Sequence, residues 1–174
     1  ADLTGFNAVD TGGGVTGVIK TKVAGTAFNL DILALKSSNT AIYTTFSGSV
    51  SVQLQDASDN SGTLDSATGC RSSWSNISGA SATASSFSNG RKAVSFTVGN
   101  AYQDVIAKMT YSYTYSCGMS TCSASIVSCS SDDFAIRPSS LNIATPTDSN
   151  WSTAGTGRNL NNTASTGGNV HKAG

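Results

Sequence analysis

The sequence contains no glutamate, a single histidine and two prolines, and charged residues make up only 11% of its 174 positions. Soluble domains usually carry about 25% charged residues. All ten acidic residues are aspartates, and the formal net charge is zero. Because the basic residues are also scattered along the chain, there is no electrostatic case for nucleic acid as a partner. Strong helix formers are scarce, whereas the abundant serine, threonine, asparagine and glycine favour strands and turns.

Long apolar runs are also missing. None approaches the roughly 20 residues that a membrane-spanning helix needs, so we expect no membrane insertion. No signal peptide is visible, and the opening Ala1-Asp2-Leu3 is typical of an internal cut. We therefore interpret the chain as a fragment of a longer secreted precursor. Hydrophobic residues make up 38% of the sequence, which is enough for one β-sandwich core.

The longest strand pattern lies between Asp104 and Pro138, and it predicts a half-buried strand followed by a terminal hairpin. The apolar residues that fall two apart, and so share one strand face, are Val105, Ala107, Met109, Tyr111, Tyr113 and Tyr115. Further strands are expected at 15–22, 28–36, 41–46, 49–55 and 92–98. Residues 1–14 are interpreted as a flexible lead-in or turn, and 80–90 as a linker or loop. The apolar parity changes near Ile32 and Leu33, which indicates a bulge or a strand buried on both faces.

This pattern predicts an all-β fold: an immunoglobulin-like antiparallel β-sandwich with disulfides over residues 1–141, followed by an extended C-terminal tail. Residues 142–174 hold few large apolar groups, and their last stretch, TGGNVHKAG, echoes TGGGVTGVIKTKVAG at 11–25. We therefore interpret the tail as a linker and the start of a following, truncated module. Such a tail could add a strand to a neighbouring copy by β-augmentation.

Four cysteines, an even number, predict two disulfides and an oxidising compartment. Of the three pairings, we favour Cys117 with Cys122, because they flank a natural hairpin tip at Gly118. Cys70 and Cys129 would then close a loop of about sixty residues, worth about 4 kcal/mol in the chain-entropy model. Pairing Cys122 with Cys129 would require a short segment to fold back on itself.

A zinc site is the competing interpretation of the cysteines. The spacing gives it little support, because no second CxxC occurs and the single histidine, His171, lies far away. Trp74 follows Cys70 closely, and we expect it to pack on a disulfide as part of the core.

Calcium is a weaker candidate ligand for the polar stretch 56–74. Asp56, Asp59, Asn60 and Asp65 could form an oxygen cage for Ca²⁺, but their spacing misses the EF-hand pattern. A surface loop of Asx turns is the favoured interpretation of this stretch.

Tyrosines supply a candidate binding surface. Tyr113 and Tyr115 on one strand face could stack against sugar rings, as in a carbohydrate-binding module. The favoured alternative is that Tyr111 belongs to the core and the other two tyrosines cover the end of the hairpin.

Catalysis finds no support in the sequence. No GxSxG motif occurs, and His171 has no nucleophile motif near it. Without glutamate, a glycosidase would need two aspartates, but Asp132 and Asp133 are adjacent and would point to opposite faces of a strand. We therefore expect neither an enzyme nor a cofactor.

Several strings of the sequence carry a family resemblance when they are taken together. They are FNAVDTGG, IKTKVAGTAFNLDILAL, QLQDASDNSGTLDSATGCRSSW, NGRKAVSFTVGNAY and SCSSDDFAIRPSSL. They resemble the repeated β-domain of MshQ-type proteins, which belong to the MSHA type IV pilus biogenesis clusters of Gram-negative bacteria. The resemblance covers residues 1–141 as one module and extends through the tail as the lead-in to the next.

In that pattern a cysteine recurs before RSSW and another before SSDDFAIRP, which supports pairing Cys70 with Cys129. The resemblance implies a secreted, pilus-associated protein at the cell surface of a Gram-negative bacterium, with no known catalytic residues. We therefore expect a structural or adhesive module, with a carbohydrate-binding module as the alternative. Its expected partners are neighbouring modules or copies of itself, pilus proteins or surface glycans.

Overall fold

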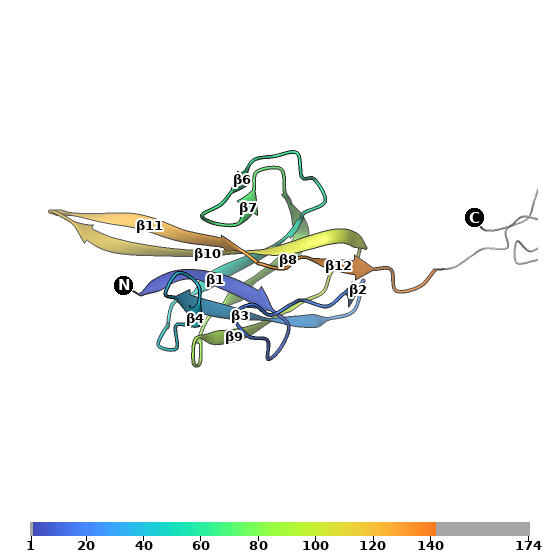
Figure 1. The fold of residues 1–174 in the computed structure, drawn as a ribbon, viewed down its shortest axis with the longest axis horizontal. Helices are drawn as coiled ribbons and strands as arrows, with labels where there is room; N and C mark the ends of the chain where they lie inside the picture. The colour runs from blue at the N-terminus through green and yellow to red at the C-terminus, as the bar shows by residue number, and fades with distance from the viewer. Residues whose placement is uncertain (1, 142–174) are drawn as a thin grey trace, which may run out of the picture. The chain divides into compact units, whose positions relative to one another are not determined.

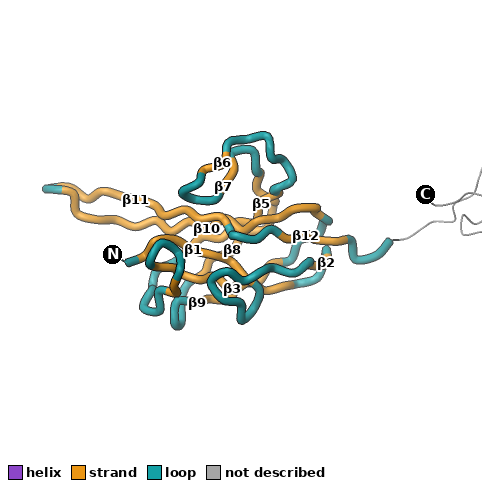
Figure 2. Tube along the Cα trace, viewed as in Figure 1, coloured by secondary structure: helices purple, strands orange, loops and turns teal. Residues whose placement is uncertain are grey.

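In the computed structural model, residues 2–141 are described, and residues 1–139 form one compact unit. Strands make up this unit, and the described residues include no helix long and apolar enough to cross a membrane. Figure 1 labels the strands, and Figure 2 separates them from the loops. They are β1 (Leu3–Val9), β2 (Lys22–Val23), β3 (Phe28–Lys36), β4 (Ala41–Ile42), β5 (Val50–Asp56), β6 (Leu64–Asp65), β7 (Cys70–Arg71), β8 (Ser75–Ala84), β9 (Arg91–Phe96), β10 (Tyr102–Cys117), β11 (Ser120–Cys129) and β12 (Phe134–Arg137).

Two sheets form the layers of a sandwich (Figure 1). In the first, β3 is central, with β1 on one side and β4 and β9 on the other, and every pairing is antiparallel. In the second, β10 is central, with β5 and then β8 on one side, and with β11 and β12 on the other. Only β2, which pairs with β12, runs parallel to its neighbour. The predicted all-β sandwich is confirmed, and its immunoglobulin-like strand order stays a prediction.

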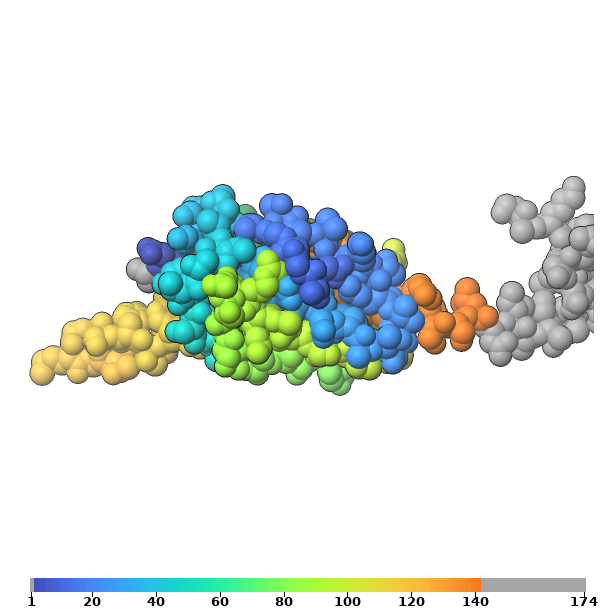
Figure 3. Space-filling view, turned by 90° about the horizontal axis from the view of Figure 1, so that it is seen from below, coloured from blue at the N-terminus to red at the C-terminus, as the bar shows by residue number. Residues whose placement is uncertain are grey.

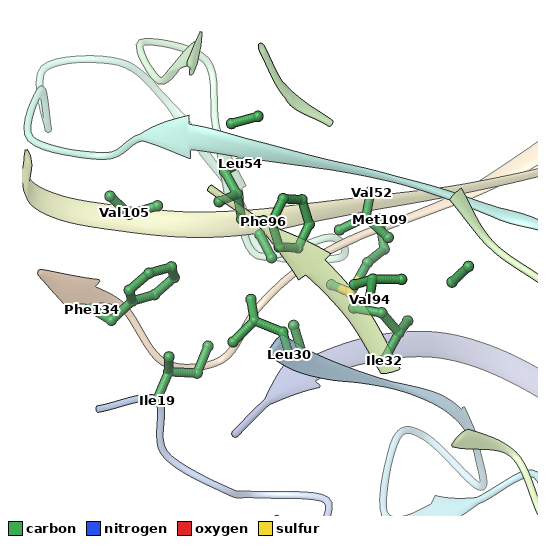
Figure 4. Close-up of a cluster of buried hydrophobic side chains, with 14 of the residues drawn as sticks. Ile19, Leu30, Ile32, Val52, Leu54, Val94, Phe96, Val105, Met109 and Phe134 are labelled. Atoms are coloured by element: carbon green, nitrogen blue, oxygen red, sulfur yellow. The ribbon is translucent and has the colours of Figure 1, made fainter. Parts of the chain in front are cut away.

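The main core lies between the two sheets. Figure 4 shows side chains from both layers pointing toward one another, among them Leu30 and Ile32 from β3 and Leu54 from β5. From β10, Val105, Ala107 and Met109 are buried in this core, as the alternating pattern predicts. The two-residue period therefore points the inner face of each long strand at the opposite sheet.

Strand β3 is buried on both faces, which decides between the two interpretations of its apolar run. Leu30 and Ile32 face the main core, while Leu33 and Leu35 form a second cluster with Val9 on the outer face. Its ladders to β1 and β9 continue without a register shift across Ile32 and Leu33, so no bulge is needed there.

The glycine-rich loop after β1 covers this outer face. Asp31, 4% exposed, accepts hydrogen bonds from the Gly12 N–H at 2.9 Å and from Arg91 Nη1 at 2.7 Å. Arg91 Nη2 also donates to the Gly13 carbonyl at 2.7 Å. A half-buried ion pair thus fixes the loop to the sheet, and the backbone of the loop glycines supplies the contacts.

Four expectations about the first half of the chain are wrong in whole or in part. Residues 3–9 form the buried strand β1, not a flexible lead-in, and the expected strand at 15–22 is a loop except at Lys22. The segment 80–90 was expected to be a linker, but its first half belongs to the ten-residue strand β8. The strand expected at 41–46 is limited to Ala41 and Ile42.

The compact unit has two distinct ends (Figure 1). The tip of the β10–β11 hairpin and the start of β1 lie toward one end, and β12 lies at the other. The predicted linker and truncated module at residues 142–174 lie outside the described residues.

Candidate functional site

The β10–β11 hairpin is the part of the unit that leaves the sandwich, and Figure 3 shows it projecting from the body. Strand β10 pairs with β5 from Val105 to Thr110, and this ladder then ends. Its pairing with β11 continues for seven more residues, from Tyr111 opposite Ile126 to Cys117 opposite Ser120. The outer half of the hairpin is therefore a two-stranded ribbon.

A tight turn and a disulfide close the tip of this ribbon. Two residues, Gly118 and Met119, connect the strands, and Gly118 has a φ of 73° while Met119 has no positive φ. A type II′ turn requires that combination, which is why glycine stands first. The Cys117–Cys122 disulfide joins the strands beside the turn, with Cα atoms 5.8 Å apart. The predicted hairpin and the predicted pairing are both confirmed.

One face of the ribbon carries a ladder of tyrosines. The rings of Tyr111 and Tyr113 are stacked, with centroids 5.6 Å apart, and those of Tyr113 and Tyr115 are tilted, with centroids 6.2 Å apart. Tyr111 is half-buried against the main core, whereas Tyr113 is 37% exposed and Tyr115 is 48% exposed. Tyr111 thus contributes to the core and the other two tyrosines cover the hairpin, and a ligand role for Tyr113 and Tyr115 stays a prediction.

A groove of about 430 Å³ lies where this ladder meets the sandwich. Its walls include Leu3, Tyr43, Phe46, Tyr111 and Tyr113. Phe46 connects the wall of the groove to the sandwich core. Its ring packs edge-on against three others, with centroid distances of 5.4 Å to Phe6, 4.8 Å to Phe87 and 5.2 Å to Tyr111. The tyrosine ladder and the groove form one aromatic surface.

The contribution of Tyr43 and Phe46 to this surface was not predicted from the sequence. A signal for it exists at Gly48, where a Cβ atom would lie 2.5 Å from the Tyr111 ring and 2.6 Å from the Phe46 ring. Gly48 lies between Phe46 and the strand β5, and its lack of a side chain leaves room for aromatic rings from other strands. The sequence does not indicate which rings these are.

The opposite face of the ribbon carries only hydroxyl groups. In order along the two strands, from Tyr111 to Ile126, they are Ser112, Thr114, Ser116, Thr121, Ser123 and Ser125. Ser112 and Ser125 lie across from each other with their Oγ atoms 3.0 Å apart. No charged residue occurs between Met109 and Ser131. The hairpin is therefore an uncharged projection with an aromatic face and a hydroxyl face.

The second disulfide lies on the outer face of the six-stranded sheet. Cys70 and Cys129 are joined with Cα atoms 5.1 Å apart, and the Cys129 N–H donates to the Thr68 carbonyl at 2.8 Å. Ile106, Ala57 and Cys129 form a small buried cluster here, and Trp74 packs against it. The predicted pairing and the predicted packing of Trp74 are confirmed. The excursion between β5 and β8, which stands off the sheet in Figure 2, is thereby fastened to it.

A cleft of about 540 Å³ lies between this excursion and the sheet. One buried polar residue of its lining, Asn7, is already used internally: its Nδ2 donates to the Val15 carbonyl and to Ser131 Oγ, both at 2.8 Å. Asn7 Oδ1 accepts from the Ser131 N–H at 3.0 Å. The cleft therefore offers no free set of polar groups from this asparagine.

The four calcium candidates mostly serve their own turns. Asp56 accepts from the Ser58 N–H and hydroxyl, and Asp65 accepts from the Ala67 N–H. Hydrogen bonds from the hydroxyl and then the N–H of Ser61 lower the pKa of the Asp59 carboxyl. These contacts are those of Asx turns. The backbone carbonyl of Asn60 accepts a hydrogen bond from Arg71 Nη1 at 3.2 Å. Among residues 2–141 no three His, Cys, Asp or Glu side chains form a metal-holding group.

The adjacent acids Asp132 and Asp133 lie just before β12, outside a strand. Asp132 Oδ2 accepts the Ile19 N–H at 2.7 Å, and this bond ties the loop before β2 to the second sheet. Asp132 therefore has a structural role.

All four cysteines of the chain lie in the described part and are paired, which indicates an oxidising environment such as the extracellular space. No family model, curated protein or solved structure matches the chain.

Proposed function

We propose that the chain is an extracellular structural or adhesive β-sandwich module of a type IV pilus-associated surface protein of a Gram-negative bacterium. The observation that carries this proposal is the projecting, uncharged hairpin, which is closed by its own disulfide and presents an aromatic face. A module that only filled space between neighbours would have no use for such a projection. Its partners would be neighbouring modules, copies of itself or pilus proteins.

Two features support a role outside the cell. Both disulfides require oxidising conditions, and the one between Cys70 and Cys129 fastens the excursion between β5 and β8 to the sheet. The resemblance to MshQ-type modules supports the link to pili. The tail, residues 142–174, could contribute by strand exchange with a neighbour.

Surface display tests this proposal. An epitope tag in the exposed turn 37–40 of the full-length protein should be labelled by antibody on intact cells of the bacterium that encodes it. The double variant Tyr113→Ser/Tyr115→Ser should be displayed equally but should reduce attachment of the cells to surfaces. Labelling that requires permeabilised cells would refute the location, and unchanged attachment would refute the adhesive role.

A carbohydrate-binding module is the second candidate, and the aromatic groove beside the exposed Tyr113 and Tyr115 is the observation that favours it. Sugars bind protein aromatics through the ring faces. Consecutive rings in the ladder lie against one another, so their faces are partly covered, and this arrangement favours the structural role. Binding to a glycan array that is lost in Tyr113→Ala and Tyr115→Ala, but retained in Ser123→Ala on the hydroxyl face, would support the carbohydrate role instead.

A further inference from the structure

The hairpin has a free edge with a defined pattern of backbone groups. In a two-residue hairpin the closing pair, Cys117 and Ser120, exchanges both backbone hydrogen bonds, and the pattern then alternates along the strand. Tyr113 and Tyr115 therefore bond to β11. The N–H and C=O groups of Ser112, Thr114 and Ser116 point to the other side of β10, beyond the end of the β5 ladder at Thr110.

Several other edges of the unit carry protection that this edge lacks, although the outer edge of β11 in the same hairpin is also free of charge, proline and bulge. Strand β9 bears Arg91 and Lys92, β2 bears Lys22, and β8 is distorted by a bulge at Gly79. Charges and bulges are the usual means by which an edge strand avoids pairing with another chain. From Ser112 to Ser116 the edge of β10 has no charge, proline or bulge, and all five residues are exposed.

The sequence of this edge matches itself. When two copies pair antiparallel about Thr114, Thr114 lies opposite the partner's Thr114, and Tyr113 lies opposite the partner's Tyr115. Aromatic pairs and threonine pairs are among the cross-strand neighbours that stabilise sheets, and no like charges meet. The antiparallel direction also places the two sandwiches at opposite ends of the joined hairpins.

We propose that two copies of this chain associate through the outer edges of their β10 strands, Ser112–Ser116, about a two-fold axis at Thr114. The product is a four-stranded ribbon in which the two tyrosine ladders share one face. This inference goes beyond the proposed function, since it depends neither on the tail nor on attachment to cells.

A charge at the axis tests it. Thr114→Lys places two ammonium groups directly opposite each other across the axis, and like charges in that position oppose pairing. Ser123→Lys is the matched control, because Ser123 lies opposite Thr114 on the same hydroxyl face but at the outer edge of β11. Both side chains are exposed, so the two variants add the same charge to the same ribbon.

Multi-angle light scattering and sedimentation of the full chain should show a dimer fraction that rises with protein concentration up to about 1 mM. Dissociation constants in this range are expected for a small interface. Thr114→Lys should raise the dimer dissociation constant at least about tenfold, and Ser123→Lys should change it less than about threefold. A wild-type chain that stays monomeric at the highest concentration would overturn the proposal. Equal effects of the two lysines would also overturn it, because they would show that net charge alone weakens association. A larger effect of Ser123→Lys would overturn it too, because the copies would then pair through the edge of β11.

Amide hydrogen exchange gives a second readout. The amides of Ser112, Thr114 and Ser116 should exchange more slowly as concentration rises, whereas the Tyr113 amide, bonded to β11, should not depend on it. Complete protection of the three amides at a dilution where light scattering shows a monomer would mean that a segment of the same chain covers the edge, and would overturn pairing between copies.

Discussion

Asp31 in β3 and Arg91 in β9 form an ion pair on the outer face of the first sheet, with Arg91 Nη1 2.7 Å from Asp31 Oδ2. Sixty residues separate them in the chain. The pair also holds the Gly12 and Gly13 backbone, so one contact joins two strands and a loop. Removal of one of the two side chains would leave the charge of the other unpaired in a partly buried position.

Arg91→Met should therefore lower the free energy of unfolding by about 2–4 kcal/mol, somewhat below the full value for a buried pair because the arginine side chain is 28% exposed. The double variant Asp31→Asn/Arg91→Met should lose less than the sum of the two single variants. Urea denaturation of all four proteins measures this coupling. Losses that add within about 0.5 kcal/mol would show that the two side chains do not act together.

The two disulfides should differ in their contribution to stability. Cys70 and Cys129 are 59 residues apart, and Cys117 and Cys122 only five. The chain-entropy model predicts a loss of about 4 kcal/mol for Cys70→Ala/Cys129→Ala and at most about 2 kcal/mol for Cys117→Ala/Cys122→Ala. Chemical denaturation under non-reducing conditions compares them directly. Equal losses would mean that the excursion is not held to the sheet through sulfur.

Phe46 should be the residue on which the base of the hairpin depends. Its ring is 6% exposed and contacts three other aromatic rings, so Phe46→Ala should cost about 3–5 kcal/mol. Tyr115→Ala is the control on the same surface, and we expect it to cost less than about 1 kcal/mol because that ring is half exposed. Thermal unfolding measures both, and a small effect of Phe46→Ala would argue against its role as an anchor.

A comparison of alanine variants at Gly90 and Gly25 should distinguish the cost of backbone strain from the cost of steric crowding. Both have positive φ, 73° and 76°, so alanine at either site should cost about 1–2 kcal/mol for the left-handed conformation. At Gly90 a Cβ atom would also lie 2.5 Å from the Tyr43 carbonyl oxygen, whereas nothing lies within 4 Å at Gly25. Gly90→Ala should therefore cost about 1–3 kcal/mol more than Gly25→Ala. Equal melting temperatures for the two variants would contradict this difference.

The alternation of β10 was sufficient to predict its strand, its inner face and the hairpin that follows it. Val105, Ala107 and Met109 obey the two-residue period because a regular ladder to β5 runs beside them. The Cys117–Cys122 pairing could also be predicted from local sequence. The two cysteines flank a turn, and Gly118 at its first position indicates the positive φ that the turn requires.

Strand β8 shows why the rest could not be predicted. Between Ser81 and Asn76 it advances five residues while β5 advances only two, from Gln53 to Gln55. Gln53 Nε2 donates to two carbonyls of this bulge, those of Ile77 and Ala80. A bulge of this kind interrupts the period of two, and the pattern then resembles a low-complexity loop.

Strand β1 was missed for a different reason. Its interior contains Gly5 and Asn7, which are unfavourable in strands in general. Here a Cβ atom at position 5 would lie 2.7 Å from Asn39 Oδ1, and the buried Asn7 side chain is bonded to Ser131. Both residues are explained by partners that are distant in the sequence.

The covalent link between Cys70 and Cys129 has a mechanical consequence. The start of β1 and the end of β12 lie toward opposite ends of the unit, so a pull applied at the two ends acts along its length. Even if the sandwich ruptured, the segment between the two sulfurs could not be drawn out, and the extended chain would be shorter by roughly 200 Å than without the bond. A stretched module would then retain β8, β9, β10 and β11 inside a closed ring, from which it could re-form its sheets once the force is released.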